Sequence, residues 1–193
     1  MKNNFFKVAT GVLFVSVLSF MFVSCKTAKV VAAADSGEIE IKIPCSGADF
    51  QSNSKALRYS AIGESMDQMT AKKKAMSEAR AGLAGAINTL VKGVTDNYVK
   101  SSNYNNKEEL MKNYEGMNRE VINQSLTGST VICEKTTMTK AGTYKYYVCI
   151  ELGGNDILQQ INNKMTTNEQ LKVDYNYEKF KKTFNEEMGK IGQ

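Results

Sequence analysis

A run of small residues at helical spacing limits the folds open to this chain more than any other feature. Large apolar residues between positions 65 and 100 recur every three or four residues, as one face of a helix requires: Leu83, Ile87, Leu90, Val94 and Tyr98. Beside them runs a stripe of small residues: Ala75, Ala79, Gly82, Ala86, Thr89 and Gly93. Each Gly costs a helix about 1 kcal/mol relative to Ala, so the stripe needs a compensating contact. The pattern predicts a long Ala/Gly-rich helix packed tightly against a sheet.

Strand patterns precede this helix. Residues 39–43 alternate isoleucine with charged residues, the period of a half-buried strand, and Pro44 ends the run by removing a backbone donor. Residues 57–62 predict a second strand. Ser65 to Gln68 then has the S-x-x-Q form of a capping box, and Asp67 suits the positive end of a helix.

Further elements follow the long helix. The patterns predict a second helix over 107–125, a hairpin with strands over 130–139 and 143–152, and two C-terminal helices over 155–165 and 175–190. Strands, then helices, then strands are typical of an α+β fold. We therefore expect a small antiparallel sheet of about four strands, packed against the long helix, with additional C-terminal helices.

The N-terminus has the features of a secretory signal peptide. Lys2 and Lys7 make a short basic segment, and residues 8–23 carry no charge. This apolar run is shorter than the ~20 residues that a spanning helix needs. It ends Phe22-Val23-Ser24-Cys25, which resembles a lipobox with Phe22 where Leu is commonest. An uncleaved single-span anchor, with Cys25 incidental, is the alternative.

Lipidation of Cys25 sets the predicted domain plan. Two or more acyl chains, such as palmitate, hold a protein stably on a membrane, whereas one does so only marginally. We predict three segments: a lipoprotein signal peptide over 1–24, a lipidated tether over 25–37, and a single α+β domain over 38–193.

Charge and tether composition bear on location. The formal charge of +5 falls to +3 without Lys2 and Lys7, which is too little to favour nucleic acid as a partner. No acidic residue follows Cys25 before Asp35, whereas acidic residues there direct some lipoproteins to the cell surface. The expected location is the cell envelope, with the lipid in the outer membrane and the domain facing the periplasm.

Three cysteines remain in a compartment that favours disulfides. If Cys133 shares the face of Val131 and is opposite Ile150, Cys149 points to the other side of the sheet. This register disfavours a bond between Cys133 and Cys149 and makes Cys45 with Cys149 the better pair. Three small buried residues are the alternative.

The chain shows no catalytic pattern. It has no histidine, which removes the commonest general base and metal ligand, and no cofactor or metal site is expected. Ser52 and Lys55 match the S-x-x-K signature of penicillin-recognising enzymes, but the partner motifs are missing and chance explains the match. Lys72-Lys73-Lys74 is best interpreted as a solvated helix surface.

A few residues are candidates for contact with a partner. Tyr144, Tyr146 and Tyr147 on the hairpin could form a surface that binds a partner. Aromatic residues in strands, however, often serve only to pack against neighbouring side chains. Glu64 lies at the corner between strand and helix, where helix capping does not explain it.

Part of the chain resembles a known family. The stretch from Leu57 to Ser65, followed by Ala71, Ala75, Ala79, Leu83 and Ala86, is similar to the twenty-kilodalton membrane-associated lipoprotein family, the LPP-twenty type. The likeness covers roughly residues 38 to 155. It implies a strand ending in glycine, an alanine-spaced helix and a closing hairpin, and it implies no catalytic residues.

These observations favour a non-enzymatic envelope lipoprotein that binds an envelope protein or forms a homo-oligomer. One alternative is a periplasmic carrier of a small apolar ligand in a pocket between helix and sheet. A hydrolase that works without histidine is the remaining one.

Overall fold

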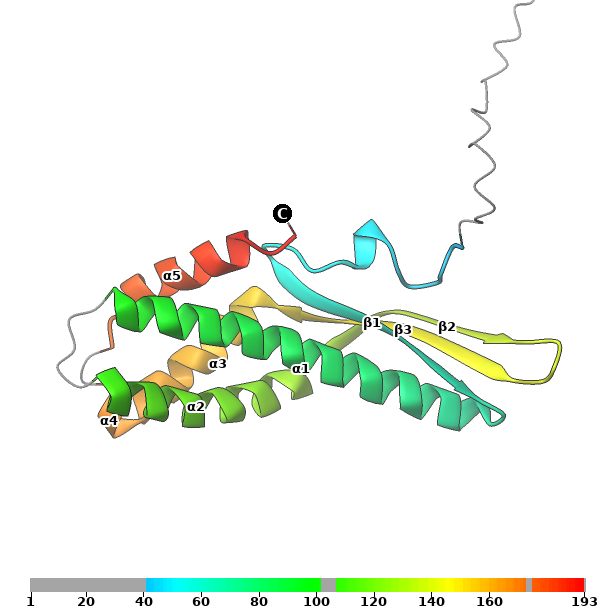
Figure 1. Ribbon diagram of the computed structural model, residues 1–193, viewed down its shortest axis with the longest axis horizontal. Helices are drawn as coiled ribbons and strands as arrows, with labels where there is room; N and C mark the ends of the chain where they lie inside the picture. The colour runs from blue at the N-terminus through cyan, green and yellow to red at the C-terminus, as the bar shows by residue number, and fades with distance from the viewer. Residues whose placement is uncertain (1–40, 102–106, 173–174, 193) are drawn as a thin grey trace, which may run out of the picture. The chain divides into compact units, whose positions relative to one another are not determined.

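Helix α1, Gln68–Lys100, is the element on which the others are arranged (Figure 1). The structure is a computed structural model, and it describes residues 41–101, 107–172 and 175–192. The described residues form one compact unit. In it, the sheet lies along the N-terminal half of α1, and further helices lie along its C-terminal half.

The sheet has three antiparallel strands in the described part of the chain. They are β1 (Ala56–Ser65), β2 (Thr130–Met138) and β3 (Tyr144–Gly153), in the order β1-β3-β2. The predicted α+β class, the small antiparallel sheet and the long helix are confirmed. The fourth predicted strand is wrong over 41–43, which belong to no strand and are exposed; residues 39 and 40 lie outside the described residues.

Small residues bring α1 onto the sheet over the first part of the predicted stripe, whereas Thr89 is exposed and Gly93 lies against Glu187 of the C-terminal helix. Ala71, Ala75 and Ala79 are fully buried against β1. At Gly63 a Cβ atom would lie 2.1 Å from the carbonyl oxygen of Ala71, so only glycine fits there. Gly82 leaves room for the ring of Tyr59. The faces of β1 are thereby assigned: odd-numbered residues face α1, and even-numbered residues form what we call the outer face.

The remaining helices enclose the C-terminal half of α1. They are α2 (Lys107–Thr127), α3 (Gly154–Thr167), α4 (Glu169–Lys172) and α5 (Tyr177–Gly189). The predicted second helix and both C-terminal helices are confirmed within two residues at each end. The short α4 was not predicted. An aromatic cluster closes this end of the core, with Tyr98 and Phe180 in edge contact at a centroid distance of 5.2 Å.

The start of α1 differs slightly from the capping-box prediction. Asp67 is the N-cap, and its carboxylate accepts from the Thr70 N–H at 2.7 Å, which lowers the pKa of Asp67. The Ser65 hydroxyl instead accepts from the Asp67 N–H. No helix in the described residues combines the length and apolar character that crossing a bilayer demands.

Candidate interaction surface

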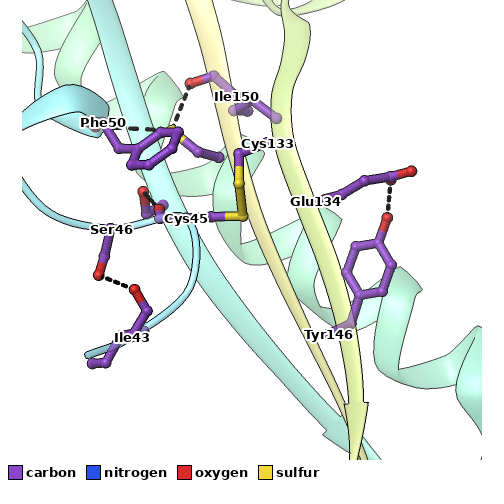
Figure 2. Close-up of a disulfide and its surroundings, with 10 residues drawn as sticks. Ile43, Cys45, Ser46, Phe50, Cys133, Glu134, Tyr146 and Ile150 are labelled. Carbon is purple, nitrogen blue, oxygen red and sulfur yellow. Dashed lines mark hydrogen bonds between the residues drawn. A yellow bond between two sulfur atoms is a disulfide. The ribbon is translucent and has the colours of Figure 1, made fainter. Parts of the chain in front are cut away.

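Residues 45–52, which precede β1, cross the outer face of the sheet and cover part of it. A disulfide joins Cys45 to Cys133 on β2, with the two Cα atoms 5.5 Å apart (Figure 2). The Ser60 hydroxyl on β1 donates to the Cys45 carbonyl at 2.6 Å. The segment is thus held on both edge strands, and no other described residues cover the part of the outer face nearest the hairpin turn.

The predicted pairing of Cys45 with Cys149 is wrong. A bulge between Val131 and Cys133 shifts the register, so that Val131 is opposite Ile150 and Cys133 is opposite Cys149. The bulge turns Cys133 to the outer face, where Cys45 passes. Cys149 does lie on the outer face as predicted, but it is a buried free thiol whose Sγ contacts the Phe50 carbonyl at 3.8 Å. Burial raises the pKa of the Cys149 thiol and keeps it protonated.

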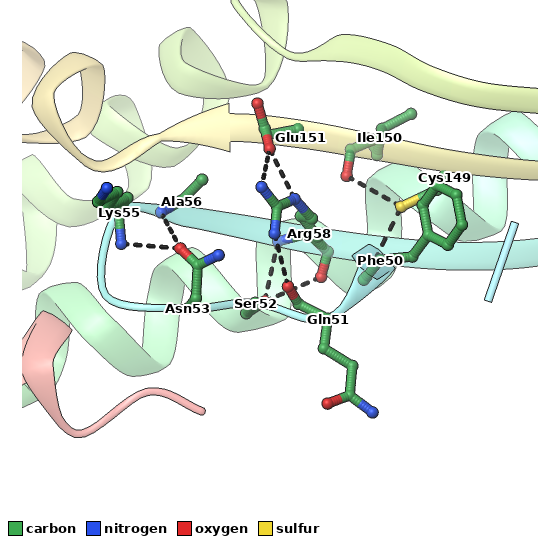
Figure 3. A network of polar contacts seen from close by, with 10 residues as sticks. All are labelled: Phe50, Gln51, Ser52, Asn53, Lys55, Ala56, Arg58, Cys149, Ile150 and Glu151. Atoms are coloured by element: carbon green, nitrogen blue, oxygen red, sulfur yellow. Dashed lines mark hydrogen bonds and ion pairs between the residues drawn. The ribbon is translucent and has the colours of Figure 1, made fainter. Parts of the chain in front are cut away.

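Ser52 caps the free edge of β1. Its hydroxyl accepts from the Arg58 N–H at 2.8 Å and donates to the Arg58 carbonyl at 3.1 Å (Figure 3). The Arg58 guanidinium also pairs with Glu151 of β3 at 2.6 Å. The Ser52 hydroxyl both donates and accepts a hydrogen bond at this edge. The fold therefore explains the serine at this position of the S-x-x-K match. This part of β1 cannot accept another strand.

The other edge of the sheet, formed by β2, has no such cover in the described residues. The Thr139 N–H donates to the Thr143 carbonyl at 2.9 Å, so these two residues form a hydrogen-bonded pair. In an antiparallel ladder such pairs recur at every second residue, which makes Lys135 and Thr137 the residues that bond to β3. The backbone groups of the alternate residues therefore point away from the sheet: Glu134, Thr136 and Met138. We call Glu134–Met138 the β2 edge.

The surroundings of the β2 edge are apolar and exposed. Met138 is 62% exposed, and Val131 and Ile132 are 44% and 39% exposed at the other end of the strand. Natural sheets usually protect an edge with prolines, a covering segment or clustered charge. Within the residues that the structure describes, the β2 edge has only the bulge and the charges of Glu134 and Lys135 as protection.

The three candidate tyrosines do not form one surface. Tyr146 is 4% exposed and faces α1, and Tyr144 is half-buried on the same side. Only Tyr147 lies on the outer face, half-buried between Ile62 and Lys135. Tyr146 is therefore unavailable to a partner.

Tyr146 instead belongs to a contact between the sheet and α1. Its hydroxyl donates to the Glu134 carboxylate, and Lys72 of α1 lies 3.4 Å from the same carboxylate and 5.2 Å from the centre of the Tyr146 ring. The hydrogen bond from Tyr146 and the charge of Lys72 lower the pKa of Glu134, while burial and that hydrogen bond raise the pKa of Tyr146. The contact fixes the side chain of Glu134 and leaves its backbone edge open.

Glu64 has a structural partner. Its carboxylate pairs with Lys145 on β3 at 3.7 Å, and its carbonyl accepts from Lys74 at 3.1 Å. Cys25, the predicted lipidation site, lies outside the described residues. The sequence signal for the β2 edge was the β-branched pair Thr136 and Thr137, but a strand pattern does not say which of its sides has a neighbour.

Comparisons of this chain with protein-family models, with curated proteins and with solved structures find no match.

Proposed function

We propose that the protein is a non-enzymatic, lipid-anchored component of the cell envelope that self-assembles by strand addition at the β2 edge. The observation that carries the proposal is that Glu134, Thr136 and Met138 present backbone groups with no partner among the described residues at an exposed edge, while Ser52 caps the opposite edge at Arg58. Main-chain hydrogen bonds supply affinity in this mode of recognition. The lipid anchor on Cys25 and the likeness to membrane-associated lipoproteins are parts of the same proposal.

The sequence of the β2 edge fits a second copy of itself. A two-fold axis perpendicular to the sheet pairs two copies of β2 antiparallel and keeps each face on its own side. Centring the pair on Thr136 places Thr136 opposite its counterpart, Lys135 opposite Thr137, and Glu134 opposite Met138. Centring on Lys135 or on Glu134 would oppose like charges, which destabilises a strand pair. Thr136 is the middle residue of the β2 edge, and we take it as the centre of the pair.

The position of α1 leaves space for this arrangement. The helix packs mainly on β1 and β3, and the long side chain of Lys72 reaches from it to Glu134 of β2. In the paired arrangement, the β2 strands of the two copies lie between their α1 helices. The helices are then further apart than the ~10 Å at which helices pack on each other. Membrane anchoring supports association further, because confinement of copies to one surface raises their effective concentration.

A single cysteine at the predicted centre tests the proposal. In the pairing centred on Thr136, the two Cα atoms lie about 5.5 Å apart, which suits a disulfide. We expect Thr136→Cys to form covalent dimers in intact cells, seen on non-reducing gels. Lys140→Cys is the matched control, because it exposes a thiol in the hairpin turn, beyond the edge. Equal dimer yield from both variants, or none from Thr136→Cys, would overturn the self-assembly proposal.

Backbone chemistry gives a second test at the same position. Thr136→Pro removes an outward N–H without removing a bond to β3, because proline is tolerated where a strand edge faces out. Thr136→Val keeps the N–H and a β-branched side chain. We expect the proline variant to be monomeric in light scattering and the valine variant to associate like the parent chain. Association of the proline variant would show that the edge is not the contact.

The anchor is tested separately by mass spectrometry of the native protein. We expect the mature chain to begin at Cys25 and to carry fatty acid there. A native chain that begins at Met1, or an unmodified Cys25, would remove the membrane part of the proposal and leave the edge contact to be judged by the cysteine experiment.

The alternative function, a carrier of a small apolar ligand, has weaker support. A hollow between β1, α1 and α5 is bounded by Leu57, Ala86, Leu90 and Ile191, but it opens to solvent beside Glu187 and Lys190. Deep apolar sites bury most of a ligand, which this hollow does not do.

A further inference from the structure

The side of β1 that faces away from β3 is the second edge of the sheet. The Arg58 N–H and carbonyl both bond to the Ser52 hydroxyl, so the backbone groups of Arg58 point toward this edge. Backbone groups of an antiparallel strand alternate in direction from one residue to the next. The outward groups that follow along β1 therefore belong to Ser60, Ile62 and Glu64. We call Ser60–Glu64 the β1 edge.

The chain covers this side of β1 up to the start of the β1 edge. The Asn53 N–H donates to the Ala56 carbonyl at 2.9 Å, and the Ala56 N–H donates to the Asn53 carbonyl at 3.3 Å. Ser52 occupies the outward groups of Arg58, which come next (Figure 3). A strand from another copy therefore has access to β1 only from Ser60 onward.

Lys74 of α1 closes the other end of the β1 edge. Its ammonium donates to the Glu64 carbonyl at 3.1 Å. A backbone N–H from an added strand would place its nitrogen about 2.9 Å from the same oxygen, so the ammonium occupies the position of that donor. Natural sheets use charged side chains, lysine above all, to keep an edge strand from pairing with another chain. Lys74 is such a residue for β1.

We propose that Lys74 limits assembly to two copies by keeping the β1 edge closed. Pairing of β2 with β2 is isologous and ends with the pair, whereas pairing of β2 in one copy with β1 in the next repeats in one direction and produces a filament. Ser60–Glu64 and Glu134–Met138 have the same length, so cover rather than size prevents the second pairing. This role rests on the proposed strand addition at the β2 edge.

Light scattering of the full-length protein in detergent, over a range of concentrations, tests this role. Lys74→Ala removes the ammonium and keeps a good helix former. Lys73→Ala is the matched control. Lys73 is exposed and lies midway between the buried Ala71 and Ala75, hence on the opposite side of α1 from the sheet.

The two lysine variants should differ in the mass that they reach. We expect the parent chain and Lys73→Ala to level off at the mass of two copies. We expect Lys74→Ala to grow with concentration to a mean mass at least about twice that value, because the β1 edge is then open to the next copy.

Second substitutions in the Lys74→Ala background show which edges are used. Ile62→Pro removes an outward N–H from the middle of the β1 edge and no bond to β3, and we expect it to restore the mass of two copies. Thr136→Pro closes the β2 edge instead, and we expect a monomer. Continued growth of either double variant would overturn the proposal, because growth would then not proceed through these edges. If Ile62→Pro does not fold, Thr136→Pro decides.

The outcomes separate the role of Lys74 from the proposed function. A parent chain that stops at two copies, together with a Lys74→Ala variant that stops there as well, would overturn the role of Lys74 and leave strand addition at the β2 edge intact. A parent chain that grows beyond two copies would also overturn this role alone, because the β1 edge would already be open. A monomeric parent chain would overturn both.

Discussion

Gly63 offers a quantitative test of how the sheet is held on α1. A Cβ atom at this position would lie 2.1 Å from the Ala71 carbonyl oxygen and 2.5 Å from the Ala75 nitrogen, and both are backbone atoms. A side chain can change rotamer to relieve a clash, but the backbone of a helix cannot. Gly63→Ala must therefore move α1 away from the sheet by about 1 Å. A gap of that size forfeits a quarter to a half of the dispersion energy of the contacts it opens.

We expect Gly63→Ala to lower the free energy of unfolding by about 3 kcal/mol, the upper part of the usual range for overpacking. Gly85→Ala is the control. It lies within α1, where a Cβ atom would meet nothing within 4 Å. Because alanine is the better helix former, Gly85→Ala should raise the free energy of unfolding by about 1 kcal/mol.

Urea denaturation measures both variants. With a slope of about 2 kcal/mol/M, the midpoint of Gly63→Ala should fall by roughly 1.5 M, and that of Gly85→Ala should rise by about 0.5 M. A Gly63→Ala midpoint within about 0.2 M of the parent chain would refute the reasoning, because the two backbones would then not be in contact at this point.

Two further predictions concern the sheet. Non-reducing peptide mapping should find Cys45 linked to Cys133, and breaking this link by serine substitution of both should cost about 3 kcal/mol; a linked peptide containing Cys149 would contradict the assignment. Glu134 has a lowered pKa in the folded chain, so its charge stabilises the fold above about pH 4.3, the ordinary pKa, and this contribution disappears as the pH falls through the lowered value. The stability difference between the parent chain and Glu134→Gln should therefore shrink from pH 6 to pH 3, and urea titrations that show it constant or growing would contradict the role of Tyr146 as donor.

The sequence alone was sufficient for the elements with long, regular patterns. The apolar repeat through Leu83 and Ile87 predicted α1, and the small stripe predicted its close approach to the sheet. The hairpin and the C-terminal helices followed in the same way, because hydrophobic periodicity depends only on which side of an element is buried. The absence of histidine likewise narrowed the chemistry without any structure. The signal-peptide pattern and Cys25 lie outside the described residues and stay predictions.

Only the tertiary structure decided the contacts that depend on a single residue of register or on a neighbour distant in sequence. The bulge beside Cys133 reversed the disulfide prediction, because one inserted residue exchanges the two faces of a strand. Ile41 and Ile43 have the strand pattern, but no described strand pairs with them. The outer side of β2 likewise has no neighbouring strand among the described residues, although its sequence is that of a strand. Asp96 and Asn118 are polar residues on two separate helices, and only the packing of α1 on α2 buries both at one cavity. Local patterns record burial, whereas pairing between segments is a property of the assembled fold.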